Sequence, residues 1–333
     1  MTDDQPSIEW GTGPDTISRE PTGGPTSVVV RRGLAASPGP GRLKRSPGGE
    51  TVGIVHLYPT LMGTYGDGGN LKVLARRLAA RGLSARVITV GPGEPVPESA
   101  DLYVLGGGED ASQIAASRAL RESGALGRAA ERGAAIFAVC AGLQVMGHDF
   151  EVSGGLIEPG LGLLDATTRR RRPRAVGEVL ARPLIPLGVN SLDRLSEPGG
   201  CAALDRPTGR QESIPGGQVD RYPLLTGYEN HGGGTALGPA ARPLAEVIRG
   251  IGNGAGGPDG DGAEGAVQGR ILATYLHGPV LARNPGLADH LLELAVNAEL
   301  QPFEAAHVDQ LRAEREQYVR SGKLSAESVR TPK

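Results

Sequence analysis

Short strand-like runs alternate with stretches of helical periodicity through the middle of the chain. Between the first two runs, Leu71, Leu74 and Leu78 recur at the spacing of one helical face, with arginines on the other faces. Residues 114–133 predict a helix interrupted near Gly124, and residues 134–150 predict a strand, an abrupt turn and a helix. The runs are rich in β-branched and aliphatic residues, as strands are: TVGIVHLYP (51–59), SARVITV (84–90) and ADLYVL (100–105).

This alternation predicts an α/β fold with a mainly parallel sheet flanked by helices. Ligands of such sheets lie beyond the carboxyl ends of the strands, where GGGED (106–110) and VCAG (139–142) fall. The second half adds further short strands, GEVLARPL (177–184), LLTGYENH (224–231) and ILATYLHGP (271–279), and terminal helices over 286–300 and 303–320.

Composition sets the boundaries of the predicted domain. The chain has 333 residues with 53 glycines and 26 prolines, more than a compact fold uses, so part of it is expected to be loop. Residues 1–50 are rich in Gly, Pro, Ser, Thr and Arg without a period, which predicts a disordered tail. The domain is predicted over 51–325, with flexible surface loops near 196–222 and 252–266.

Charge and cysteine content exclude several classes of function. The 35 basic residues nearly balance the 37 acidic ones, so a general electrostatic grip on nucleic acid is not expected. Two cysteines, Cys140 and Cys201, make no disulfide framework and fit a reducing compartment. No signal peptide and no run of about 18 apolar residues is found, which predicts a cytoplasmic protein.

Cys140 is the first candidate for chemistry. It follows a predicted strand and opens a predicted helix, and the partial positive charge of a helix N-terminus favours a thiolate. Ala141 and Gly142 allow a sharp turn that would expose backbone N–H groups, as at the nucleophile elbow of hydrolases. The alternative is a buried structural cysteine, a common state for a free thiol. Cys201 lies in a Gly/Pro-rich stretch and is assigned no role.

A thiolate nucleophile needs a base, and His277 is the preferred candidate. It follows the apolar run ILATYL at a predicted strand end, which would place it on the same edge of the sheet as Cys140. His231 in GYENHGGGT is the rival, and His290 and His307 are weaker candidates. A histidine after an apolar run can also be an ordinary core residue.

Two further motifs have competing interpretations. TYGDGGN (64–70) could be taken for a phosphate loop, but it lacks the following Lys-Ser/Thr, so a strand-to-helix turn with Asp67 and Asn70 as helix caps is the simpler interpretation. RRRRPR (169–174) is either a solvated basic run or part of a carboxylate-binding site.

Taken in order, LYPTLMGTYGDGGN, GGGED, VCAGLQVMG, GYENHGGGT and TYLHGP resemble class I glutamine amidotransferases. Within that class they look like the GatD-type glutaminase subunits of lipid II isoglutaminyl synthases, in the cobyric-acid-synthase-like branch. The resemblance covers about residues 52–320.

The resemblance implies roles for particular residues. Cys140 would attack the side-chain amide of L-glutamine, and His277 would move the protons. Backbone N–H groups of Ala141 and Gly107 would form the oxyanion hole, and Gln144 belongs to the same substrate-binding motif. Arg174, three residues before Gly177, would bind the α-carboxylate of glutamine.

One position departs from the wider class. Many members have a glutamate two residues after the histidine, where this chain has Pro279. Either a Cys–His pair suffices or an acid comes from elsewhere, such as a partner subunit.

The resemblance also implies a partner and an acceptor. No metal site or cofactor is expected in this chain; ATP and Mg²⁺ are expected in a Mur-ligase-like synthetase subunit that completes a heterodimer. The ammonia would amidate D-glutamate of the lipid II stem peptide to D-isoglutamine. Three rival hypotheses stay open: a glutaminase for another ATP-dependent amidation of corrinoid type, a cysteine peptidase of related fold, and a catalytically silent binding subunit.

Overall fold

The computed structural model describes residues 51–64, 66–187, 223–255, 261–303 and 305–321. The predicted tail over 1–50 and the predicted loop over 196–222 lie outside these residues. The strands are β1 Thr51–Leu57, β2 Ser84–Val90, β3 Leu102–Leu105, β4 Ala135–Val139, β5 Asp149–Glu151, β6 Ile157–Pro159, β7 Ala166–Pro183, β8 Leu225–Leu237, β9 Ala245–Arg249, β10 Ala263–Glu264, β11 Ala266–Gln268 and β12 Ile271–Thr274. The helices are α1 Gly69–Ala79, α2 Asp110–Ser123, α3 Ala125–Glu131, α4 Ala141–Met146, α5 Val280–Arg283, α6 Pro285–Val296 and α7 Ala306–Arg320, with a 3₁₀ turn at Ser153–Gly155.

The predicted parallel sheet is confirmed. Its strand order is β11-β12-β4-β3-β1-β2, and every pair is parallel except the edge pair β11–β12. Strands β3, β4 and β12 are buried along their whole length, which explains why their sequences are continuous apolar runs rather than alternating ones. The carboxyl ends of β12, β4, β3 and β1 therefore lie next to one another at one edge of the sheet.

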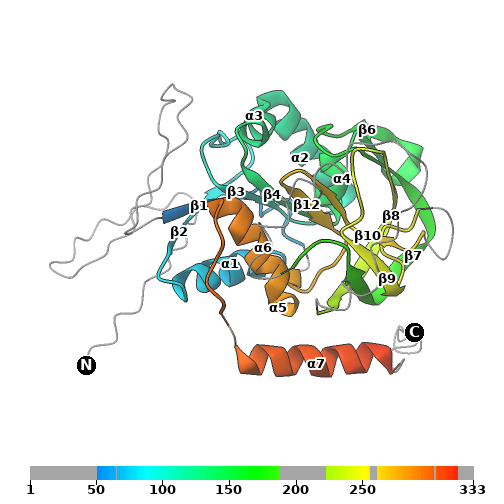
Figure 1. The fold of residues 1–333 in the computed structure, drawn as a ribbon. Coiled ribbons are helices and arrows are strands. Elements are labelled where there is room, and N and C mark those ends of the chain that lie inside the picture. The colour runs from blue at the N-terminus through cyan, green and yellow to red at the C-terminus, as the bar shows by residue number, and fades with distance from the viewer. Residues whose placement is uncertain (1–50, 65, 188–222, 256–260, 304, 322–333) are drawn as a thin grey trace, which may run out of the picture.

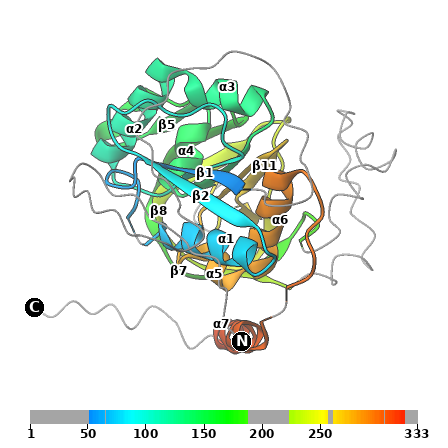
Figure 2. The ribbon, with the colours of Figure 1, turned by 90° about the vertical axis from the view of Figure 1, so that its left-hand side faces the viewer.

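Helices cover both faces of this sheet (Figures 1 and 2). Helices α1, α5 and α6 pack together on one face, and α2, α3 and α4 lie on the other. Gly124 takes a left-handed conformation, ends α2 and precedes α3, so the interruption predicted there is confirmed. Helix α7 lies outside these layers and contacts β7 (Figure 1). Among the described residues, no helix has the length and apolar character needed to cross a membrane.

A second, mostly antiparallel sheet was not predicted. Its order is β10-β9-β7-β5-β6, and the long strand β8 pairs with β7. Burial alternates along β8, so one of its faces packs against the rest of the protein. Two backbone hydrogen bonds join Tyr228 of β8 to His277, N–H to O at 3.2 and 2.8 Å. The second sheet therefore borders the edge at which the main sheet ends.

Residues 252–254 and 264–266 do not form the surface loop predicted near 252–266, because they are buried. Asn253 and Glu264 are fully buried, and Asn253 Nδ2 donates to the Gly265 carbonyl at 2.9 Å. Glycine content suggested a loop, but these glycines serve close backbone packing: a Cβ on Gly252 would lie 2.3 Å from the Ala263 carbonyl oxygen. Residues 256–260 lie outside the described part.

One of the arginines of α1 is buried. Arg77 is 7% exposed rather than solvated, and it donates two hydrogen bonds of 2.6 Å to the carboxylate of Asp289 on α6. Arg81 lies 3.0 Å from the same carboxylate. A buried pair of this kind fixes how two elements meet, because either charge alone would be buried without compensation.

We predict that Asp289→Ala destabilises the fold by about 3–5 kcal/mol, because Arg77 and Arg81 lose the carboxylate that compensates their burial. Glu246→Ala removes the exposed Arg182–Glu246 pair and is the matched control, expected to cost about 0–1 kcal/mol. Urea unfolding of both variants measures the difference. Equal effects would show that the Arg77–Asp289 pair does not hold α1 to α6.

Candidate active site

Cys140 lies on a strained turn between β4 and α4. Its φ of 53° and ψ of −108° are unusual for a residue with a side chain, and its N–H donates to the Thr274 carbonyl oxygen at 2.7 Å. Gly142 permits the close approach that follows, since a Cβ there would lie 2.7 Å from the Leu105 carbonyl oxygen. The predicted strand–cysteine–helix elbow is therefore present.

His277 lies beside Cys140, as the sequence predicted. A Cβ built on Gly107 would lie 2.9 Å from His277 Cε1 and 3.3 Å from Cys140 Cβ. His277 is 1% exposed, and its imidazole is hydrogen-bonded to Asp67. Two segments separated by more than a hundred residues are thus brought to one point by the parallel order of β12 and β4.

Asp67 completes this group, and sequence reasoning missed it. Its Oδ1 lies 3.1 Å from His277 Nδ1, and its Oδ2 accepts the Gly107 N–H at 2.8 Å. The carboxylate is fully buried and does not cap α1 with its side chain. The predicted capping role is therefore wrong for Asp67, and the carboxylate that contacts the imidazole belongs to the TYGDGGN turn of this chain.

These contacts set the charge of His277. Burial lowers the pKa of the imidazole, but the hydrogen bond to Asp67, the hydrogen bond to Cys140 and their negative charges outweigh it and raise the pKa to about 10. The imidazole is therefore protonated at neutral pH and can donate a proton. This is the charge state that a proton donor to a leaving amine needs.

His56 at the end of β1 lies near the same turn but has the opposite charge behaviour. Burial lowers the pKa of His56 to about 4, although the Asp67 charge opposes this. His56 is therefore neutral at neutral pH. Asp67 consequently has one cationic imidazole to pair with, that of His277.

The remaining predicted histidines have other surroundings. His231 stacks on the Tyr275 ring at 3.8 Å, and its Nδ1 donates to the Gly233 carbonyl at 2.8 Å. His290 lies on α6, where burial lowers its pKa to about 4. His307 is exposed on α7. Of these candidates, His277 is the one that the structure brings to Cys140.

Gln144 lies behind the nucleophile in a buried polar network. Its Oε1 accepts from Gln113 Nε2 at 2.8 Å, and its Nε2 donates to the Tyr275 hydroxyl at 3.1 Å. Tyr275 also bonds Thr235 Oγ1 at 2.6 Å. The side-chain amide of Gln144 is thus used to join α4 to α2 and to the segment that carries His277.

The two predicted oxyanion donors differ in availability. Ala141 opens α4, where the first backbone N–H groups have no partner within the helix. The Gly107 N–H, in contrast, is bonded to Asp67 in this structure. In this structure the Gly107 N–H therefore binds Asp67, and the missing Cβ of Gly107 leaves space for His277.

Arg174 lies in the irregular part of β7, between the two registers in which β7 pairs with β8. Its guanidinium donates to the side-chain and main-chain oxygens of Asn230 at 2.7 and 3.0 Å. Asn230 follows Tyr228, the residue bridged to His277, by two positions on β8. Arg174 is therefore tied to the wall of the site rather than to the reacting pair.

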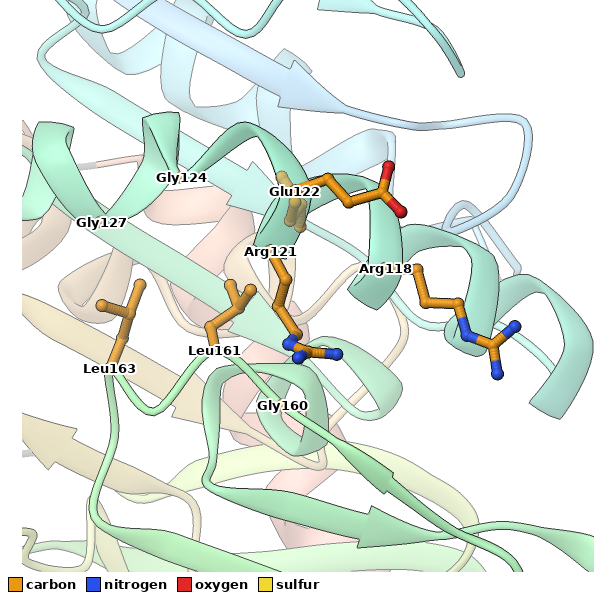
Figure 3. A pocket seen from close by; sticks show the side chains of 9 residues that line it. Arg118, Arg121, Glu122, Gly124, Gly127, Gly160, Leu161 and Leu163 are labelled. Carbon is orange, nitrogen blue, oxygen red and sulfur yellow. The ribbon is translucent and has the colours of Figure 1, made fainter.

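A pocket of about 430 Å³ lies elsewhere, between α2, α3 and residues 160–163 (Figure 3). Arg121 extends from α2 toward Gly160, with Leu161 and Leu163 alongside (Figure 3). Neither Cys140 nor His277 lines it. Across the described ranges, no group of three or more His, Cys, Asp or Glu side chains is arranged to hold a metal ion.

A cysteine on a strained turn, a buried imidazolium and a carboxylate at the carboxyl edge of a parallel sheet suit hydrolysis of an amide through a thioester. Residues 53–285 match the CobB/CobQ-like glutamine amidotransferase domain. The chain therefore belongs to the CobB/CobQ-like glutamine amidotransferase family and is a glutamine amidotransferase enzyme.

Among curated proteins, the chain is 28% identical over 258 residues to the lipid II isoglutaminyl synthase (glutamine-hydrolyzing) subunit GatD of Staphylococcus aureus, covering 77% of this chain and 89% of that protein. It is 28% identical over 249 residues to the GatD subunit of Streptococcus pneumoniae, covering 74% and 80%. It is 29% identical over 216 residues to the cobyric acid synthase of Sphingopyxis alaskensis, covering 62% and 34%.

Asp67→Asn is expected to lower kcat for glutamine hydrolysis about 10²- to 10⁴-fold, because the imidazolium loses its orienting carboxylate. Since Asp67 raises the pKa of His277, the variant should lose activity at lower pH on the alkaline side than the wild type. A pH profile of kcat/KM measures this shift. Asp149→Asn, which alters the half-exposed pair with Arg169, is the control. An unchanged alkaline limb would contradict the assignment of Asp67.

Gly107→Ala is expected to lower kcat about 10²-fold while the protein stays folded, because the new Cβ displaces His277 from Cys140. Gly127→Ala is the control, since its Cβ would make an ordinary 3.8 Å contact with Leu163. Steady-state kinetics measure the kcat of both variants, and thermal unfolding measures whether both are folded. Wild-type kcat in folded Gly107→Ala would show that His277 does not need this space.

Proposed function

We propose that the chain is the glutamine-hydrolysing subunit of a lipid II isoglutaminyl synthase. In this proposal it releases ammonia from L-glutamine through Cys140 and His277. A Mur-ligase-like partner that uses ATP and Mg²⁺ receives the ammonia and amidates D-glutamate of the lipid II stem peptide to D-isoglutamine. The observation that carries the chemistry is the buried His277, which is hydrogen-bonded to Asp67 and lies with Cys140 around the missing Cβ of Gly107.

The first half-reaction uses the protonated imidazole. The Cys140 sulfur attacks the side-chain amide carbon of glutamine, and the amide oxygen takes the negative charge, facing the Ala141 N–H. The C–N bond then breaks, His277 gives its proton to the leaving nitrogen, and ammonia departs from a γ-glutamyl thioester. Gly107 would join the oxyanion donors once its N–H exchanges Asp67 for the substrate oxygen.

The second half-reaction needs His277 as a base. Part of the raised pKa of His277 comes from its hydrogen bond to Cys140 and from the charge of Cys140. Both contributions disappear while the sulfur is acylated, so the pKa of the imidazole falls at the stage when it must take a proton from water. The water attacks the thioester carbon, glutamate leaves, and the thiolate re-forms beside the imidazolium.

Arg174 is proposed to bind the α-carboxylate of glutamine, and Gln144 to shape the pocket floor. Arg174 already orients its guanidinium through Asn230, which reduces the side-chain entropy lost on binding. Gln144 acts from behind the nucleophile through Tyr275.

The choice between a lipid II acceptor and a corrinoid acceptor rests on the share of each relative's length that this chain covers. The chain covers 89% of the Staphylococcus aureus GatD subunit but 34% of the cobyric acid synthase. The match along most of the length of the GatD subunit therefore favours a lipid II acceptor over a corrinoid acceptor. A cytoplasmic location follows from the same proposal, since its substrate is free glutamine and its ligase partner uses ATP.

We predict that Cys140→Ala lowers the rate of glutamate release from glutamine by at least about 10³-fold, because the thioester cannot form. Cys201→Ala, which removes the other thiol, should keep wild-type activity. The full-length chain is assayed alone and with a Mur-like ligase subunit, ATP and lipid II. Formation of amidated lipid II supports the acceptor, a corrinoid amide would favour the alternative, and activity in Cys140→Ala would refute the nucleophile.

A further inference from the structure

A buried carboxyl group outside the reacting residues contacts the strand that carries His277. Glu264 of β10 is fully buried, and its Oε1 accepts the Thr274 hydroxyl and the Tyr275 N–H, the latter at 3.1 Å. Its Oε2 is buried, and no hydrogen-bond partner for it is found among the residues that the structure describes. Burying a carboxyl group costs free energy. The hydrogen bonds that Glu264 accepts from Thr274 and Tyr275 offset this cost and suggest its role.

Thr274, the residue that Glu264 holds, is connected to both members of the reacting pair. Its carbonyl oxygen accepts the Cys140 N–H at 2.7 Å, and its hydroxyl oxygen accepts the Leu276 N–H at 3.1 Å. His277 follows Leu276 directly. A displacement of Thr274 would therefore move the nucleophile turn and the imidazole relative to each other.

Burial favours the neutral form of Glu264, whereas the hydrogen bonds that it accepts favour the charged form. Burial raises the pKa of Glu264 to about 7, hydrogen bonds from Thr274 and Tyr275 oppose this, and the charge of Glu229 adds to it. Glu229 on β8 accepts the N–H groups of Ile251 and Gly252, both at 2.9 Å, and its Oε2 lies 3.7 Å from His231 Nε2. A neutral acid keeps a carbonyl oxygen as acceptor without adding a charge near His277.

We propose that Glu264 is a positioning residue, which through Thr274 fixes the end of β12 and so the geometry of the Cys140–His277 pair. The inference rests on the proposed function, because it takes those two residues as the reacting pair. It differs from a role in stability alone, because it assigns Glu264 and Thr274 an effect on the chemical step that the other buried residues of β12 do not have.

Two pairs of variants in the full-length chain separate the effect of losing the Glu264–Thr274 hydrogen bond from the effect of changing side-chain size. Thr274→Val removes the hydroxyl and Thr274→Ser keeps it; Glu264→Leu removes the acceptor and Glu264→Gln keeps a carbonyl oxygen. We expect Thr274→Val and Glu264→Leu to lose about tenfold or more in kcat with little change in KM, and the conservative variants to stay close to wild type. Leu272→Ala, a buried position on β12 without this contact, should lower the unfolding temperature and keep kcat.

The rate of Cys140 alkylation by iodoacetamide across pH is the second readout. Thr274→Val should shift this profile to higher pH because His277 no longer holds its place beside the thiolate, whereas Leu272→Ala should not. If Glu264→Leu fails to fold, Thr274→Val decides alone. Wild-type kcat and alkylation in Thr274→Val, or equal losses in Leu272→Ala, would overturn the inference. An active Cys140→Ala would instead overturn the proposed function.

Discussion

One backbone hydrogen bond, from the Cys140 N–H to the Thr274 carbonyl oxygen, underlies the geometry of the site. Cys140 has a positive φ, which costs a residue with a side chain about 1–3 kcal/mol and persists only where neighbours enforce it. The bond ties the end of β4 to the end of β12. Consequently this one hydrogen bond positions both the turn that carries Cys140 and the segment that leads to His277.

The order of the sheet explains how the other groups reach that point. His277, Cys140, Gly107 and Asp67 follow β12, β4, β3 and β1, which are neighbours in this order. Strands lie about 4.8 Å apart, so the outer two are separated by roughly 14 Å, too far for direct contact of their backbones. Asp67 and His277 meet because the residue between them is glycine, whose missing Cβ would lie 2.9 Å from the imidazole.

The sequence was sufficient to predict the parallel sheet and the Cys140–His277 pair, because apolar runs mark strands and their ends mark one edge. It could not identify Asp67, since nothing in TYGDGGN shows that a residue 210 positions before His277 points at it. Its only local signal is an acid in a glycine turn after β1. The antiparallel sheet and the burial of residues 252–254 and 264–266 were hidden by glycines, which mark both loops and close packing.

Two buried acids contact the segment that carries His277, and in the proposed mechanism their charges have different effects. Asp67 supplies the negative charge that keeps His277 protonated. A second full charge at Glu264 would add to that field and hold the proton more tightly, which would hinder its transfer to the leaving ammonia. The pKa of Glu264 is raised to about 7 by burial and by Glu229, so the anchor of Thr274 is partly or largely neutral in the range where the enzyme works. Burial thus separates the electrostatic task of Asp67 from the positional task of Glu264.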